Sequence, residues 1–129
     1  MKRILLTIVF TIFFTGCGLE TLTIEDYYKN DLEEVSEIEV FDGSYGSSRT
    51  TTNKKEIQSF IKEVKDIKFI PDEDQSERDG FIYSITFYEG DKVTLQFGLN
   101  QIGDAYYNTE PDIEPIVEEL FNSMSEQDS

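Results

Sequence analysis

Apolar and polar positions recur along this chain with two different periods, which predict strands and helices. Apolar and acidic residues alternate in Val35–Phe41, as in a strand with one buried face. Apolar residues also recur at every second position of 81–88 and 93–99, where they form one face of each segment. In 53–67 and 112–124 the apolar residues instead recur every three or four positions, as on an amphipathic helix. The chain is therefore expected to combine a β-sheet with two helices.

Turn residues separate the predicted strands. The glycine- and serine-rich segment Asp42–Ser48 follows the first strand and precedes the β-prone segment Arg49–Thr52, so a hairpin is expected here. Asn100–Asp104 is expected to form a later turn, after which Ala105–Asn108 pairs back with Tyr107 facing inward. These turns predict an antiparallel meander.

The length of the loop between the predicted strands 81–88 and 93–99 follows from matching their apolar faces. The faces match if Phe87 lies opposite Val93, which predicts the three-residue loop Glu89–Asp91. The two-residue loop Gly90–Asp91 is the commoner hairpin type. It would set Tyr88 opposite Val93 and place the apolar rows on opposite faces, so the longer loop is expected.

Capping signals locate the two helices. Asn53 followed by Glu56 is typical of a capping box and marks the start of the first helix. Pro115 is tolerated only in a first turn, so Asp112 is expected as the second N-cap, with Pro115 as the third helical residue. Together the elements predict an α+β fold, a two-layer sandwich in which an antiparallel sheet of about four to five strands carries two amphipathic helices on one face.

The start of the chain has the order of an export signal. Lys2–Arg3 form a basic start, the uncharged and almost wholly apolar run Ile4–Phe14 follows, and Thr15 and Gly16 precede Cys17. This is the order of a secretory signal peptide. The apolar run is well short of the roughly 20 residues that span a bilayer, so a permanent membrane helix is not expected.

Phe14-Thr15-Gly16-Cys17 resembles the lipobox of bacterial lipoproteins, which usually reads Leu, Ala or Ser, Gly or Ala, and Cys. The resemblance implies that diacylglycerol is transferred to the Cys17 thiol, that cleavage follows Gly16, and that acyl chains such as palmitate hold the protein on the extracytoplasmic face of the cell membrane. An uncleaved anchor, or an ordinary secretory signal with an incidental cysteine, is the alternative. Cys17 is the only cysteine of the chain, which favours lipidation.

The predicted organisation follows from this signal. Residues 1–16 form the cleaved signal peptide, 17–31 the lipidated cysteine with an acidic tether, 32–125 a single α+β domain and 126–129 a frayed C-terminus. A flexible segment as long as the tether reaches roughly 20 Å. Its apolar residues Leu22 and Ile24 leave open that part of it docks onto the domain.

The composition limits the partners. Loss of Lys2 and Arg3 lowers the basic count from 11 to 9 against 27 acidic residues, a mature net charge of −18. Nucleic acid and anionic lipid headgroups repel such a chain. No nucleic acid is therefore expected as a partner.

The residue chemistry excludes several classes of enzyme. The chain has no histidine, so the usual catalytic triads and histidine-ligated zinc are absent. Ser59 and Lys62 match the Ser-x-x-Lys of penicillin-recognising enzymes, but the motifs that accompany it there are missing. No catalytic residue and no cofactor are predicted.

Three surface features remain as candidate sites. The acidic loop 71–80 supplies weak metal-ligand candidates, although a solvated loop is the alternative: Asp72, Asp74, Glu77 and Asp79. One flank of the first helix forms either a solvated face or a docking patch for an anionic partner: Lys54, Lys55, Lys62 and Lys65. Gly43–Ser48 is a candidate recognition loop around Tyr45.

Taken whole, the chain resembles the small uncharacterised lipoproteins of Bacillus-type Gram-positive bacteria, with their lipobox, short acidic tether and single α+β domain. That resemblance transfers no catalytic or ligand residue. The expected function is a membrane-anchored, non-enzymatic module that binds a protein, a peptide, a wall polymer or an ion. A small enzyme or enzyme accessory that works through paired carboxylates is the alternative.

Overall fold

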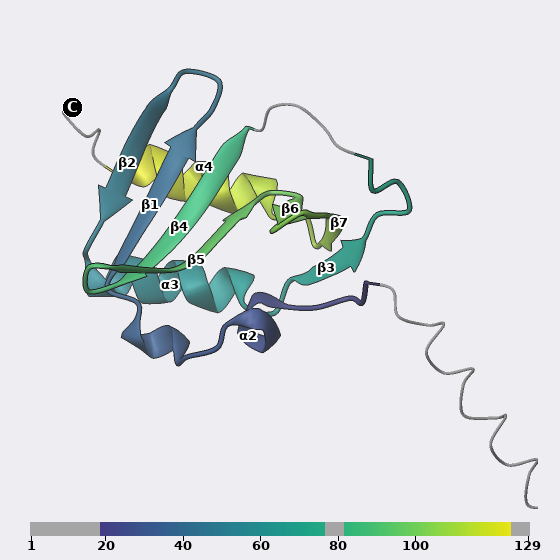
Figure 1. The fold of residues 1–129 in the computed structure, drawn as a ribbon. Helices are drawn as coiled ribbons and strands as arrows, with labels where there is room; N and C mark the ends of the chain where they lie inside the picture. Colours follow the sequence, from purple (N-terminus) through teal and green to yellow (C-terminus); the bar gives the residue numbers. More distant parts are fainter. Residues whose placement is uncertain (1–18, 77–81, 125–129) are drawn as a thin grey trace, which may run out of the picture.

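Seven strands form one antiparallel sheet in the order β2-β1-β4-β5-β6-β7-β3 (Figure 1). The computed structural model describes residues 19–76 and 82–124. In chain order its elements are α2 (Ile24–Tyr27), the 3₁₀-helix η2 (Leu32–Glu34), β1 (Glu37–Asp42), β2 (Ser47–Thr51), α3 (Lys54–Val64), β3 (Lys68–Pro71), β4 (Tyr83–Glu89), β5 (Lys92–Gly98), β6 (Gln101–Ile102), β7 (Ala105–Glu110) and α4 (Glu114–Ser123). The predicted α+β class is confirmed, whereas the prediction of four to five strands is wrong.

The two strands that the prediction omits are short. β6 has two residues, too few for an alternating pattern, and the four residues of β3 do not alternate, since Phe69 and Ile70 are adjacent. β3 pairs with β7 and extends the sheet beyond the predicted meander. β6 divides the predicted turn Asn100–Asp104 into two tight turns.

The long helices lie on the same side of the sheet in Figure 1. α3 begins after the predicted cap, since the Asn53 side chain accepts a hydrogen bond from the Glu56 backbone N–H at 3.0 Å. The apolar stripe of α3 is buried as its spacing predicts: Ile57, Phe60, Ile61 and Val64. The predicted N-cap at Asn53 is confirmed, whereas the reciprocal half of a capping box is replaced: the Asn53 backbone N–H donates to Thr51 Oγ1 at 3.1 Å and Glu56 Oε2 accepts from the Ser123 hydroxyl at 2.9 Å.

The start of α4 differs from the prediction by one residue. The N-cap is Ile113 rather than the predicted Asp112, and the helical residues begin at Glu114, so Pro115 is the second of them rather than the third. Asp112 still accepts a hydrogen bond from the Glu114 backbone N–H at 3.1 Å, and Thr109 Oγ1 accepts one from Ile113 N–H at 3.1 Å. The two side chains together satisfy donors that the proline-containing first turn leaves without helical acceptors.

The loop of the β4–β5 hairpin is shorter than predicted. Glu89 pairs with Lys92 and Tyr88 with Val93, which leaves a two-residue loop at Gly90–Asp91. A β-bulge then adds Thr94, so that Phe87 pairs with Leu95 and the apolar rows return to the same face. Val93 is consequently 58% exposed, while Leu95 is buried.

The segment predicted as a tether belongs largely to the folded domain. Leu22 forms an antiparallel bridge with Phe69 of β3, with N···O distances of 3.0 and 2.7 Å in the two directions. Ile24 and Tyr28 join the hydrophobic core. The possibility that Leu22 and Ile24 dock onto the domain is confirmed, and the domain therefore begins near Leu22 rather than at residue 32.

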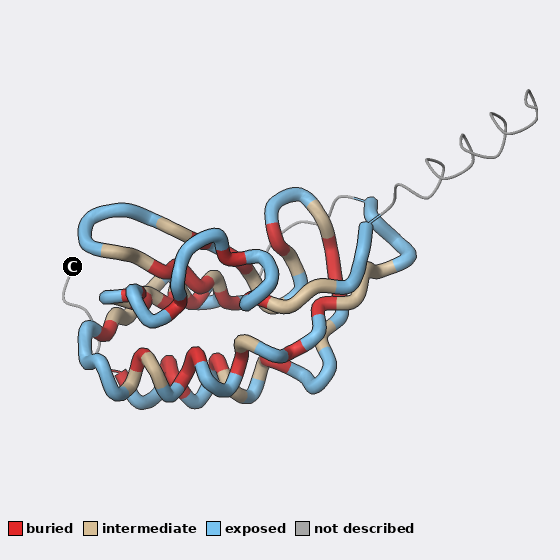
Figure 2. The backbone as a smooth tube through the Cα atoms, turned by 90° about the horizontal axis from the view of Figure 1, so that it is seen from below, coloured by how far each residue is buried: buried red, intermediate tan, exposed pale blue. Residues whose placement is uncertain are grey.

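The core lies between the sheet and the helices, where buried segments of both layers face each other (Figure 2). Aromatic rings connect its parts through edge-to-face contacts. Phe87 and Phe97 have ring centroids 5.7 Å apart, and Phe69 and Tyr107 lie 6.0 Å apart. Tyr107 is buried, as predicted. Phe69 thus joins the missed strand β3 to the main core.

Candidate functional site

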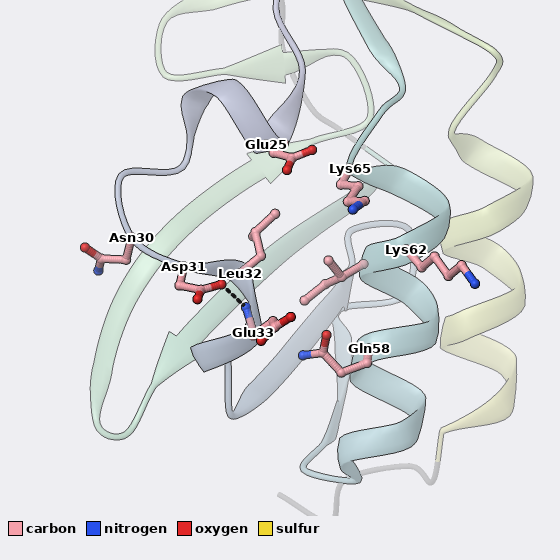
Figure 3. A pocket seen from close by; sticks show the side chains of 9 residues that line it. Glu25, Asn30, Asp31, Leu32, Glu33, Gln58, Lys62 and Lys65 are labelled. Carbon is pink, nitrogen blue, oxygen red and sulfur yellow. Dashed lines mark hydrogen bonds between the residues drawn. The ribbon is translucent and has the colours of Figure 1, made fainter.

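A groove lies between the N-terminal segment and α3 (Figure 3). It has a volume of about 550 Å³. Both charge signs and two apolar side chains line it: Glu25, Asn30, Asp31, Leu32, Glu33, Gln58, Ile61, Lys62 and Lys65. The volume lies within the range of small-molecule sites.

Local hydrogen bonds hold the N-terminal wall of the groove. Thr23 caps α2 by accepting from the Asp26 backbone N–H at 3.1 Å. Asp31 caps η2, because its Oδ1 accepts from the Glu33 backbone N–H at 2.9 Å. These caps place the carboxylates of Glu25, Asp31 and Glu33 along one side of the groove.

The opposite wall is one face of α3. Gln58, Ile61, Lys62 and Lys65 follow each other at spacings of three, one and three residues, which places them on neighbouring positions of the helix surface. Figure 3 shows the Gln58 amide nitrogen directed toward Glu33. It also shows the Lys65 ammonium on the side of Glu25, whereas the Lys62 ammonium points away from the groove.

Gln58 has an unsatisfied polar atom. Its Nε2 is buried, and no group among residues 19–76 and 82–124 accepts a hydrogen bond from it. A buried donor without an acceptor is unfavourable, because it has lost its hydrogen bonds to water and gained none in exchange. Gln58 is therefore the residue of this groove for which an added acceptor would matter most.

A hydrogen-bonded cluster attaches the N-terminal segment to the β4–β5 hairpin. The Tyr28 hydroxyl donates to Glu89 Oε2 at 2.6 Å and also contacts the hydroxyl of Thr94, the bulge residue. Asn30 Nδ2 donates to the same Glu89 oxygen at 3.4 Å. Burial, followed by the hydrogen bond to Glu89, raises the pKa of Tyr28 to about 12. The cluster fixes the part of the segment that continues into the groove wall.

The four lysines of the predicted docking patch do not share one environment. Lys54 and Lys55 are exposed in the first turn of α3, outside the groove. Lys62 and Lys65 line the groove, the Lys65 ammonium on the side of Glu25 and the Lys62 ammonium directed away from the carboxylates (Figure 3). Anion docking at these residues stays a prediction.

The predicted metal ligands of the acidic loop are only partly described. Glu77 and Asp79 lie outside the described residues. Asp72 accepts from the Asp74 backbone N–H at 3.0 Å, and Asp74 accepts from the Ser76 backbone N–H at 3.0 Å. In the part of the chain that the structure describes, no group of three or more acidic or cysteine residues could hold a metal ion.

The remaining sequence candidates lie apart from the groove. The lipobox residues, Gly16 and Cys17 included, fall outside the described residues. Tyr45 is 85% exposed at the tip of the β1–β2 hairpin, as a recognition loop requires. Ser59 is exposed on the side of α3 that faces α4.

Sequence reasoning missed the groove because its two walls were assigned to different parts of the chain. Asp31 and Glu33 fall at the boundary between the predicted tether and domain, while Gln58 falls inside a helix predicted for other reasons. Leu22 and Ile24 carried the available signal, since apolar residues in an acidic tether indicate docking.

Comparison with known family models, with curated proteins and with solved structures finds no match for this chain. Within residues 19–76 and 82–124, the helices are all too short or too polar to cross a membrane.

Proposed function

We propose that this protein is a lipid-anchored binding module on the extracytoplasmic face of the cell membrane, and that it is not an enzyme. The observation that carries the proposal is the position of Cys17. This single cysteine ends a lipobox-like tetrapeptide and precedes Leu22, the first residue paired with the sheet, by five positions. Resemblance to small lipoproteins of Bacillus-type bacteria supports the same conclusion.

The docked N-terminal segment makes the proposed anchor short. The four residues Gly18–Thr21 lie between Cys17 and Leu22, and the five Cα–Cα steps from Cys17 to Leu22 span at most about 17 Å. Because Leu22 is bound to the edge strand β3, that end of the domain would lie next to the lipid. The tip of the β1–β2 hairpin lies on the other side of the molecule from this entry point (Figure 1). The anchored domain would thus present Tyr45 away from the membrane.

Replacement of Cys17 tests the anchor. In a Gram-positive host, wild-type protein is expected in the membrane fraction, since two acyl chains give durable attachment. Cys17→Ser is expected in the medium, or in the membrane as unprocessed precursor distinguishable by size. Thr21→Ser, which leaves the lipobox intact, is the matched control and stays membrane-bound. Mature-sized Cys17→Ser protein in the membrane fraction would contradict the proposal.

A further inference from the structure

The groove between the N-terminal segment and α3 has the polar groups of a ligand site rather than those of a solvated crevice. On its helical side, the buried Gln58 Nε2 has a proton to donate and no acceptor among the described residues. A carbonyl or carboxylate oxygen is the group that would satisfy this donor. Since the nitrogen points toward the exposed Glu33 side chain in Figure 3, an incoming oxygen would approach it from the side of Glu33.

The charges of the groove favour a cation over an anion. Three carboxylates line it, from Glu25, Asp31 and Glu33. Of the two lysines, Lys62 directs its ammonium away from the groove, so that Lys65 is the basic group left near Glu25 (Figure 3). The carboxylates of Asp31 and Glu33 therefore favour a positively charged group close to the Gln58 donor.

The space beside these polar groups is apolar. Leu32 and Ile61 line the groove, and both belong to the hydrophobic core, which fixes their positions. Such a wall accepts a small aliphatic group better than a polar one, because contact removes apolar surface from water.

We propose that this groove binds an α-aminoacyl group, as found at the N-terminus of a short peptide. Its ammonium lies between Asp31 and Glu33, its carbonyl oxygen accepts from Gln58 Nε2, and its aliphatic side chain contacts Leu32 and Ile61. The proposal rests on the proposed function, because it names a ligand class for a module that is proposed to bind one.

Three probes separate the parts of this chemistry. Alaninamide carries the ammonium, the carbonyl and the methyl group, N-acetylalaninamide lacks the cation, and propylamine lacks the carbonyl. Each is titrated into ¹⁵N-labelled protein purified from membranes in detergent, and the Gln58 side-chain amide resonances are followed by NMR. Alaninamide is expected to shift these resonances saturably, whereas the other two do so weakly.

Substitutions test whether alaninamide binds at Gln58. Gln58→Leu is expected to weaken alaninamide binding by about tenfold, as the loss of one hydrogen bond near a charged group predicts. It is followed through backbone amides of α3, and thermal unfolding of each variant shows that it is folded. Gln96→Leu is the matched control, because Gln96 donates to Thr86 on the sheet at 3.1 Å and lies outside the groove. That variant binds as the wild type does.

Two results would overturn the proposal. The first is an absence of saturable shifts with alaninamide, or shifts of equal size with propylamine or N-acetylalaninamide. The second is unchanged affinity in folded Gln58→Leu. Neither result bears on membrane attachment, which the Cys17→Ser fractionation reads separately.

Discussion

Tyr28 shows how one side chain can fasten a segment that sequence analysis places outside the domain. Its ring packs edge-to-face on Phe87, with centroids 6.2 Å apart, and its hydroxyl donates to Glu89. Tyr28→Phe keeps the ring and removes the hydroxyl. We expect it to lower the free energy of unfolding by about 1.5–3 kcal/mol, the size of a hydrogen bond to a charged group. Urea unfolding at pH 7 measures this difference.

The same substitution has a predictable pH dependence. The folded-state pKa of Tyr28 is raised to about 12 from the ordinary value of 10. The contribution of the Tyr28 hydroxyl to the free energy of unfolding is therefore complete below pH 10 and is lost as the pH rises toward 12. The stability difference between wild type and Tyr28→Phe should shrink over that window, while the other tyrosines cancel in the comparison. A difference that stays constant would show that the hydroxyl is not stabilised in its neutral form.

At the scale of single residues, the sequence predicts helix caps better than it predicts hydrogen bonds between distant residues. Asn53 is recognisable because its acceptor, donor and helix lie within four residues of each other. Glu89 and Tyr28 are 61 residues apart, and nothing local in either segment indicates their hydrogen bond. The unsatisfied Gln58 donor is harder still to predict, since nothing in a sequence marks a missing acceptor.

The β4–β5 hairpin shows what an alternation pattern leaves out at the scale of an element. If both strands were unbroken, only the longer loop would keep Val93 on the apolar face. The structure keeps the commoner two-residue loop and adds Thr94 as a bulge. A bulge costs ladder hydrogen bonds locally but shifts the alternation by one residue. The Thr94 hydroxyl also contacts Tyr28, which gives the bulge a tertiary partner.

A pair of substitutions tests this register. Val93 is 58% exposed, so Val93→Thr should change the free energy of unfolding by less than about 0.5 kcal/mol. Leu95 is 7% exposed and belongs to the core, so Leu95→Ala should cost about 2–5 kcal/mol. Chemical denaturation of both variants measures these changes in the free energy of unfolding. Equal and large losses would indicate the three-residue loop, in which Val93 is buried.

The N-terminal segment gives a second test at the level of elements. Ile24 is 1% exposed, and Ile24→Ala should therefore destabilise the domain by about 2–5 kcal/mol. Leu19 is 47% exposed and precedes the bridge at Leu22, so Leu19→Ala is the control and should leave stability within about 0.5 kcal/mol. If Ile24→Ala were as neutral as Leu19→Ala, residues 22–31 would behave as the tether that the sequence alone predicts.

For the whole molecule, the sequence predicts the class of the fold, whereas the groove required the structure; lipidation of Cys17 stays a prediction. Two helical stripes and three long strands imply an α+β arrangement because each buries one face. The strand order depends on β3, whose residues do not alternate, and on β6, which is too short for a pattern. The groove depends on the docking of 22–35 against α3, a long-range contact that local periodicity does not encode.

The net charge of the protein and its proposed anchor have opposite effects on membrane attachment. The mature chain would carry a net charge of −18, which opposes adsorption to anionic lipid. The proposed anchor nevertheless holds the β3 end within about 17 Å of the membrane. Under the proposed function the acyl chains on Cys17 supply the attachment, because the lysines of α3 are too few to offset this charge.

The intact mass of the protein extracted from membranes of expressing cells tests the central claim most directly. A mature chain that begins at Cys17 and carries diacylglycerol on the thiol is predicted, and mild lipase or alkaline treatment should remove the ester-linked acyl mass. Peptide mapping would place the modification on the N-terminal residue. A chain that retains Met1–Gly16, or that begins at Cys17 with a free thiol, would contradict the account.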